Sequence, residues 1–317
     1  MKSILEQALE AHLAGEFPQA KWLYNEAIKL GTNDPAAHAN LGYILKEEGA
    51  LKEALEETNK ALKKSPNNPT FLMNSAGIHL ELGHYRQAIE SSNRSLKIQP
   101  NNPIALANLG SAYQAIGDLK NAEYFTVQSL KIQPDNTTTL TTLGLIKLAK
   151  NQLKEAFQIA QKALKYNPQL DQAHLLAGKV LEAYGDITQA KEAFYNALIC
   201  NNNCAGALLA LSLQSISNDE AQEILKAGES IIKERLNSEG LASLYYALSG
   251  CYHKLKDYAR SQQYLELAHH QKSHSYASNK SELIKAIHHF SSQSDMKSGV
   301  DVGISQINRV FIVGMPR

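Results

Sequence analysis

Small side chains recur along this chain at a fixed spacing of 34 residues, between larger apolar and polar positions. An alanine returns six times at this interval, at Ala20, Ala54, Ala88, Ala122, Ala156 and Ala190. A period of roughly 20–50 residues is typical of stacked supersecondary units, and one of about 34 is typical of a helix–turn–helix unit. The pattern predicts pairs of antiparallel helices that approach each other closely at these alanines.

Helix-breaking residues recur with the same period. When the alanine is numbered position 20 of each unit, position 15 is glycine in five units and Asn151 in the fifth of the six. Glycine adopts the left-handed conformation just past a helix, and asparagine is its usual substitute. Proline stands at position 32 in four units, where the second helix must have ended. The next helix is announced by an Asx–Pro pair at Asp34-Pro35, Asn68-Pro69 and Asn102-Pro103.

Small residues at positions 8, 20 and 27, glycine at 15 and proline at 32 resemble the tetratricopeptide repeat. The resemblance covers residues 1–203 in six units. It implies an all-α, right-handed solenoid, and we expect a degenerate seventh unit over residues 205–237. An eighth unit then carries matching residues at Tyr245, Leu248, Ser249, Tyr252, Tyr258, Ser261 and Ala268. The sequence thus predicts a solenoid over residues 1–270, followed by a cap helix and linker over residues 271–308.

The resemblance also implies which residues line the inner surface of the solenoid. Position 6 of the first helix faces inward in the family, and here it is Asn40, Asn74 and Asn108 in successive units. An amide side chain can donate to a peptide carbonyl and accept from a peptide N–H at once. The row is similar to the asparagine ladder of O-linked N-acetylglucosamine transferase. Two interpretations stay open: contact with a bound peptide, or hydrogen bonds between repeats.

Two further residues, Tyr43 and Met73, are predicted to give the groove a partly apolar character. The basic residues with which chaperone-binding members of the family clamp a terminal carboxylate are absent at position 5. We therefore expect an extended protein or peptide segment of mixed character in the groove.

The last nine residues, RVFIVGMPR, differ from the helical array. The β-branched and aromatic run 310–313 predicts a strand that enters a turn at Gly314. The string resembles the start of the sulfotransferase fold, whose first phosphosulfate-binding loop is of the type GxPRSGTT. By that resemblance Gly314, Pro316 and Arg317 begin a binding site for 3′-phosphoadenosine 5′-phosphosulfate in residues 309–317, and the catalytic domain would follow.

Composition excludes several classes of function. The net charge of +1 gives no reason to expect a nucleic acid or an anionic membrane surface as partner. No apolar run is long enough for a membrane span, and three cysteines give no disulfide framework, so a cytoplasmic protein is expected. Cys200 and Cys204 lack further ligands at suitable spacing, and the adjacent pairs His269-His270 and His288-His289 cannot easily chelate one ion, so no metal is expected.

Three functional hypotheses follow from the sequence. The first is the substrate-recognition part of a sulfotransferase, without catalytic activity in this chain itself. The second is a free-standing adaptor that assembles other proteins. The third is a spacer module of a carbohydrate-modifying transferase.

Overall fold

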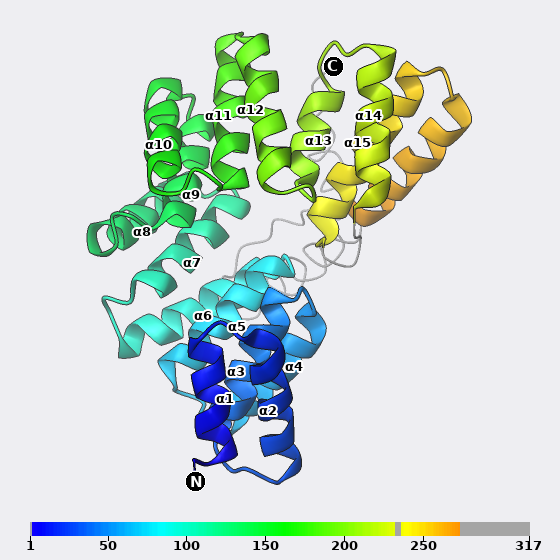
Figure 1. Cartoon of the computed structure of the whole chain (residues 1–317). Coiled ribbons are helices and arrows are strands. Elements are labelled where there is room, and N and C mark those ends of the chain that lie inside the picture. The colour runs from blue at the N-terminus through cyan, green and yellow to red at the C-terminus, as the bar shows by residue number, and fades with distance from the viewer. Residues whose placement is uncertain (1, 232–235, 273–317) are drawn as a thin grey trace, which may run out of the picture. The chain divides into compact units, whose positions relative to one another are not determined.

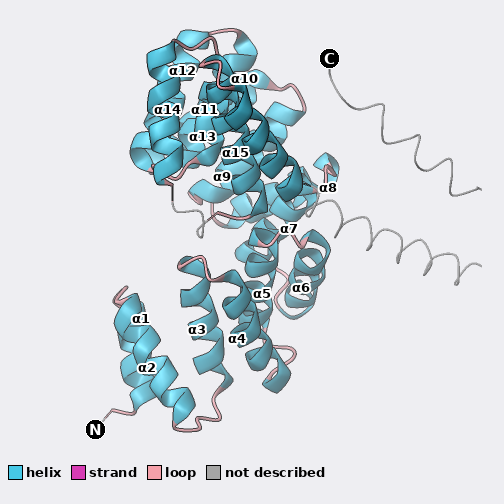
Figure 2. Ribbon diagram, turned by 90° about the vertical axis from the view of Figure 1, so that its right-hand side faces the viewer, coloured by secondary structure: helices cyan, strands magenta, loops and turns pink. Residues whose placement is uncertain are grey.

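The computed structural model describes residues 2–231 and 236–272, which all belong to one compact unit, Met1–Ser275. Every regular element in these ranges is a helix (Figures 1 and 2). The first twelve helices form six antiparallel pairs: α1 (Ile4–Leu13) and α2 (Phe17–Lys29), α3 (Pro35–Glu47) and α4 (Leu51–Lys64), α5 (Pro69–Glu81) and α6 (Tyr85–Ile98), α7 (Pro103–Ala115) and α8 (Leu119–Ile132), α9 (Thr137–Ala149) and α10 (Leu153–Tyr166), α11 (Asp171–Tyr184) and α12 (Ile187–Cys200). The prediction of an all-α stack of helix pairs is confirmed.

The sequence signals for helix starts act through side-chain caps. The side chains of Asp34, Asn68, Asn102 and Asn136 each accept a hydrogen bond from a backbone N–H of the first turn. Proline is the first helical residue after three of these caps, where its missing N–H has no intrahelical partner to lose. The loop and the first helix of each new unit are therefore fixed locally.

Left-handed residues set the turn inside each pair. Gly15, Gly49, Gly83, Gly117 and Gly185 all have positive φ, and Asn151 takes the same conformation with φ 57°. The eighth unit reaches the same turn with Lys256, at φ 64°, where the other units have glycine or asparagine.

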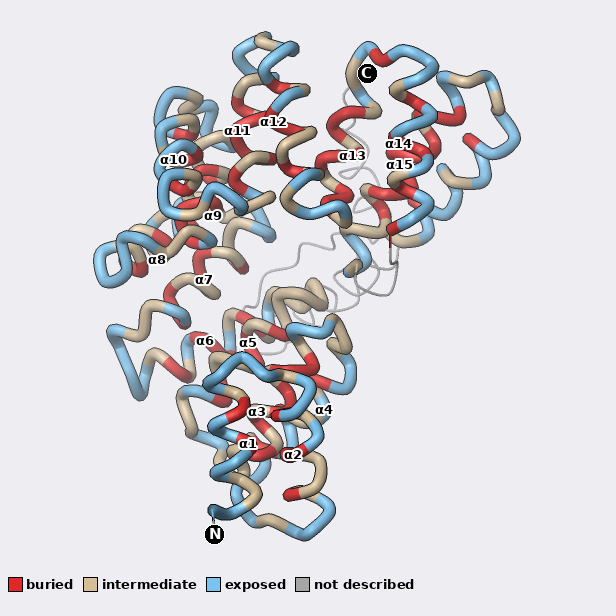
Figure 3. The backbone as a smooth tube through the Cα atoms, in the orientation of Figure 1, coloured by how far each residue is buried: buried red, intermediate tan, exposed pale blue. Residues whose placement is uncertain are grey.

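The recurring small residues lie where helices touch. The alanine at position 20 is fully buried in all six units. At position 8, a Cβ built on Gly178 would lie 2.4 Å from Cε1 of Phe194, and one on Gly144 would lie 2.2 Å from Cδ2 of Leu176. Buried residues recur in every helix of the stack (Figure 3). The predicted role of these positions, close helix approach, is confirmed.

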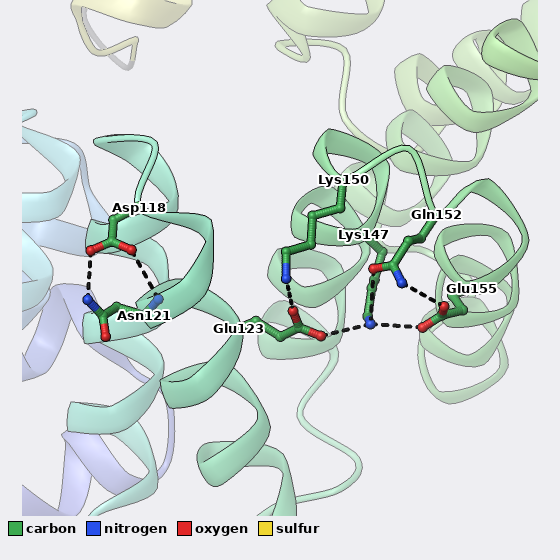
Figure 4. A network of polar contacts seen from close by, with 7 residues as sticks. All are labelled: Asp118, Asn121, Glu123, Lys147, Lys150, Gln152 and Glu155. Carbon is green, nitrogen blue, oxygen red and sulfur yellow. Dashed lines mark hydrogen bonds and ion pairs between the residues drawn. The ribbon is translucent and has the colours of Figure 1, made fainter.

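The junction between the fourth and fifth pairs is polar (Figure 4). Lys147 of α9 places Nζ 2.7 Å from Oε1 of Glu123 in α8 and 2.8 Å from Oε2 of Glu155 in α10. Lys150 binds the other carboxylate oxygen of Glu123. Hydrogen bonds from Lys147 and Lys150 hold the pKa of Glu123 below its usual value. Gln152, the residue before α10, also contacts Nζ of Lys147 through its side-chain oxygen.

Regularity is lost after α12, as the sequence predicts. The seventh unit has a short first helix, α13 (Ala205–Ser212), and a second helix, α14 (Asn218–Ser230). In the eighth unit α15 (Ser238–Lys254) is followed by a helix over residues 258–272. Side chains of α13, α14 and α15 share one core cluster, centred on residues such as Leu208, Leu244 and Leu248. The predicted cap helix, linker and strand of residues 273–317 lie outside the described residues.

In the ranges that the structure describes, no helix combines the length and the apolar character that crossing a bilayer requires.

Candidate functional site

The three predicted asparagines lie on neighbouring first helices. Asn40 is in α3, Asn74 in α5 and Asn108 in α7, and α5 contacts both α3 and α7. All three side chains are half-buried. They therefore form one row across three units, but their contacts differ.

Asn40 is engaged in the fold. Its Nδ2 donates to the Tyr24 hydroxyl at 2.9 Å, and that oxygen lies 3.4 Å from Nδ1 of His12. Tyr24 is buried, and burial raises the pKa of its hydroxyl. The amide of Asn40 thus links the second unit to the first, and one of its donor groups is used in doing so.

Asn74 makes no side-chain hydrogen bond with any residue in the described ranges. The reason is the residue at position 24 of the preceding unit, which is Tyr24 for Asn40 but the shorter Thr58 for Asn74. Asn108 is intermediate, since its Nδ2 lies 3.4 Å from the carbonyl oxygen of Met73. The amide with the most free hydrogen-bonding capacity is therefore that of Asn74.

The two predicted apolar residues lie beside this row. Tyr43 stacks on the imidazole of His12 with ring centroids 5.4 Å apart, and Phe17 meets both rings edge-on. Met73 is half-buried on α5. The structure therefore brings Tyr43 into an aromatic cluster at the N-terminal end of the row.

A charged centre next to Tyr43 was missed by the sequence analysis. Nζ of Lys46 lies 2.6 Å from Oε1 of Glu47, 3.4 Å from Oε1 of Glu81 and 5.3 Å from the centre of the Tyr43 ring. Burial opposes the charge of Lys46, but the bonds to Glu47 and Glu81 outweigh burial and raise its pKa. Burial also raises the pKa of Glu81. Lys46 stands at position 12 of the repeat, and Glu47 and Glu81 stand at position 13. These positions face inward in the family, so they could have indicated the charged centre from the sequence.

Family models match the chain over most of these helices. Models described as "Tetratricopeptide repeat" match residues 5–69, 104–136, 137–170 and 242–268, and one described as "TPR repeat" matches residues 76–117. The chain is built from tetratricopeptide repeats.

Solved structures show the same fold at low sequence identity. A tetratricopeptide repeat protein from Parabacteroides merdae ATCC 43184 is 18% identical, with a TM-score of 0.57 over 84% of this chain and 97% of that one. PilW, described as a type IV pilus biogenesis factor, is 21% identical, with a TM-score of 0.54 over 62% and 91%. The Cut9–Hcn1 structure gives a TM-score of 0.61 at 14% identity, over 80% of this chain and 50% of that one. No curated protein sequence matches this chain.

The first helices of the central tetratricopeptide units are nearly free of charge. Helix α7 has no acidic, basic or histidine residue. Helix α9 has only Lys147, which is paired with Glu123 and Glu155. Helix α5 has His79 and, at its end, the Glu81 of the charged centre. The row of asparagines is therefore followed along the stack by first helices, α7 and α9, that carry almost no free charge.

The described cysteines and metal-ligating residue types of the tetratricopeptide array give no evidence of a reactive thiol or a metal site. Burial raises the pKa of the Cys204 and Cys251 thiols to about 11, so both are protonated at neutral pH. Cys200 forms no disulfide bond. In the part of the chain that the structure describes, no three histidine, cysteine or acidic residues are grouped to hold a metal ion. Gly314, Pro316 and Arg317, the predicted start of the phosphosulfate loop, lie outside the described residues.

Proposed function

We propose that this tetratricopeptide array binds an extended, uncharged segment of a partner protein across α3, α5, α7 and α9. The observation that carries the proposal is the free amide of Asn74, half-buried between Asn40 and Asn108 on adjacent helices. An extended chain presents unpaired N–H and C=O groups, and one asparagine amide serves both.

The character of the face limits the segment that fits. The near absence of charge on α7 and α9 favours side chains without charge, because a charged group placed there would lose water without gaining an ionic partner. Lys46 is already bound to Glu47 and Glu81, so it gives no free cation for an acidic tail. A neutral, extended peptide is therefore the proposed ligand.

A random peptide library displayed on phage tests this proposal. Binders selected on the full chain are synthesised, and their Kd is measured by fluorescence polarisation. Asn74→Ala is expected to weaken binding by about fivefold, since a hydrogen bond of this type contributes roughly 1 kcal/mol. Asn93→Ala, on the exposed face of α6, is the matched control and should leave the Kd unchanged.

Two results would contradict the proposal. One is that the library yields no binder that competes for a single site. The other is that Asn74→Ala and Asn93→Ala bind the selected peptides equally, with both variants folded by circular dichroism.

A second, finer proposal rests on the sequence of residues 309–317. We infer that the array selects the acceptor for a sulfotransferase domain that takes 3′-phosphoadenosine 5′-phosphosulfate. The support is the resemblance of Gly314, Pro316 and Arg317 to the start of the phosphosulfate loop. The free-standing adaptor and the spacer of a carbohydrate-modifying transferase are the competing functions.

Sequencing the gene beyond the codon for Arg317 separates these functions. Ser-Gly-Thr or Ser-Gly-Ser as the next residues would support the sulfotransferase. A stop codon there would instead leave the adaptor as the function to pursue. Either result leaves the peptide-binding test above intact, because that test uses only residues 1–317.

A further inference from the structure

The last turn of the second helix carries a lysine at the same repeat position in five successive units. This is position 29, and its residues are Lys29, Lys63, Lys97, Lys131 and Lys165. All five are exposed. Lys29 pairs with Glu26 of its own helix, whereas the other four make no ion pair with any residue of the described ranges. The chain thus presents a row of free cations that its net charge of +1 conceals.

An exposed apolar side chain follows most of these lysines. At position 30, Leu30 is 76% exposed, Ile98 46%, Ile132 45% and Tyr166 50%. The second unit has another cation, Lys64, in this place. Each of four units therefore ends its second helix with a cation and an apolar group side by side in solvent.

The pairs lie along one edge of the stack. Each second helix packs against the first helix of the next unit, so the ends of the second helices follow one another from unit to unit along the stack. Acidic residues at this side are Glu6 and Glu26 in the first unit, and Asp34, Asp135 and Asp171 at or just before the starts of first helices. Six lysines, Lys64 included, outnumber them at this edge.

A last-turn lysine also offsets the helix dipole, which accounts for a cation at position 29. That effect does not call for an exposed leucine, isoleucine or tyrosine beside it. A lipid surface uses both groups, because lysine bonds to headgroup phosphates while the apolar neighbour enters the interfacial region. Nucleic acid would use the lysines but would leave the aliphatic groups in water.

We propose that this edge, positions 29 and 30 of the first five units, docks on an anionic lipid bilayer surface. The array then lies on the membrane through its helix ends and leaves the faces of the first helices free. This inference is independent of the proposed peptide binding.

Co-sedimentation of the full chain with phosphatidylcholine vesicles, with and without phosphatidylserine, tests the inference. Binding is expected only with phosphatidylserine and should weaken as salt is raised. The variant Lys63→Gln, Lys131→Gln, Lys165→Gln should bind about a hundredfold more weakly, because each lysine near an anionic surface contributes roughly fivefold.

The matched control lies on the same three helices. Lys52→Gln, Lys120→Gln, Lys154→Gln removes three exposed lysines from the opposite ends of α4, α8 and α10, about 16 Å away along each helix. This control should bind the vesicles like the wild type. Equal losses in the two triple variants would overturn the inference, since general charge and not this edge would then explain the binding.

A third variant tests the apolar half of the edge. Ile98→Gln, Ile132→Gln keeps every charge and should weaken vesicle binding by about tenfold. Wild-type binding by this variant, together with binding to poly-glutamate, would replace the lipid surface with an acidic macromolecule. Absence of wild-type binding to phosphatidylserine vesicles would also overturn the inference.

Discussion

At the scale of single residues, the fold depends on the absence of side chains at a few helix contacts. Gly178 lies against the ring of Phe194, which is fully buried, and an added Cβ would overlap that ring. Gly77, in the middle of α5, has no neighbouring atom within 4 Å of an added Cβ. Both glycines are helical, and they differ in whether a neighbouring side chain occupies the space that an added Cβ would fill.

We expect Gly178→Ala to lower the free energy of unfolding by about 1–3 kcal/mol, because the added methyl group overpacks a closed contact. Gly77→Ala should raise it by up to about 1 kcal/mol through helix propensity. Urea denaturation followed by circular dichroism measures both. Equal effects of the same sign would mean that packing at position 8 does not limit stability.

A half-buried histidine, His79, gives the chain a dependence on pH. Nδ1 of His79 lies 3.4 Å from Nδ1 of His84, and burial, with the neighbouring histidine, lowers the pKa of His79 to about 4. In the unfolded chain the group titrates near 6.5. The unfolded state therefore binds this proton first as the pH falls.

The stability that neutral His79 contributes is thus complete above pH 6.5 and is lost as the pH falls from 6.5 to about 4. His79→Tyr introduces the residue type that two other units carry at the same repeat position, as Tyr113 and Tyr252. We expect the urea midpoint of the variant to fall less than that of the wild type over this range. Parallel curves for the two proteins would contradict this account.

The sequence shows which residues take part in the asparagine row but not how each is bonded. Position 6 is asparagine three times, so the row itself is readable from the period. Asn40 is bonded and Asn74 is free because position 24 of the preceding unit is Tyr24 for the first and Thr58 for the second. That contact joins residues 16 positions apart on different helices. Periodicity within one helix carries no information on such pairs.

At the scale of elements, the junctions between helix pairs differ in polarity. Position 21 of one unit contacts position 14 of the next unit, and in two places this contact is an ion pair. The base is at position 21 in Lys21–Glu48 and at position 14 in Glu123–Lys150. Between them, the same positions hold Leu55 and Leu82, and then Ile89 and Ile116. Neighbouring pairs therefore meet through different chemistry at equivalent places.

Reversing one ionic junction tests this interpretation. Lys21→Glu places two carboxylates together and is expected to cost up to about 1 kcal/mol, the usual limit for an exposed pair. Adding Glu48→Lys restores an ionic contact with the polarity of the Glu123–Lys150 junction and should recover most of the loss. A double-mutant cycle in urea gives the coupling, and a coupling near zero would show that the pair contributes nothing.

At the scale of the whole molecule, the helices that pack closely are one or two places apart in the chain. Stability of such an array is approximately a sum over units and their neighbours. The 34-residue period was enough to predict the six regular pairs. The edge of lysines was not predicted from the total charge, because a sum over the chain discards the positions of the charges.

Nearest-neighbour packing predicts the behaviour of a shortened chain. The fragment of residues 1–203 retains all six regular pairs and should keep their helical content. It should unfold at lower urea than the full chain, since Phe194 and Ala197 lose the α13 side of their core cluster. Circular dichroism measures both quantities. An unfolded fragment would show that the seventh and eighth units are required for the others.

The unequal junctions bear on how a gene of this kind changes length. Recombination between repeats deletes or duplicates whole units and brings two new junction residues together. Deletion of the third unit would bring together Leu55 and Ile116, two aliphatic residues. Deletion of the second unit would instead place the charged Lys21 next to Leu82. The first change keeps an apolar contact at the junction, whereas the second leaves a lysine without its ionic partner, so we expect the first to cost the array less stability.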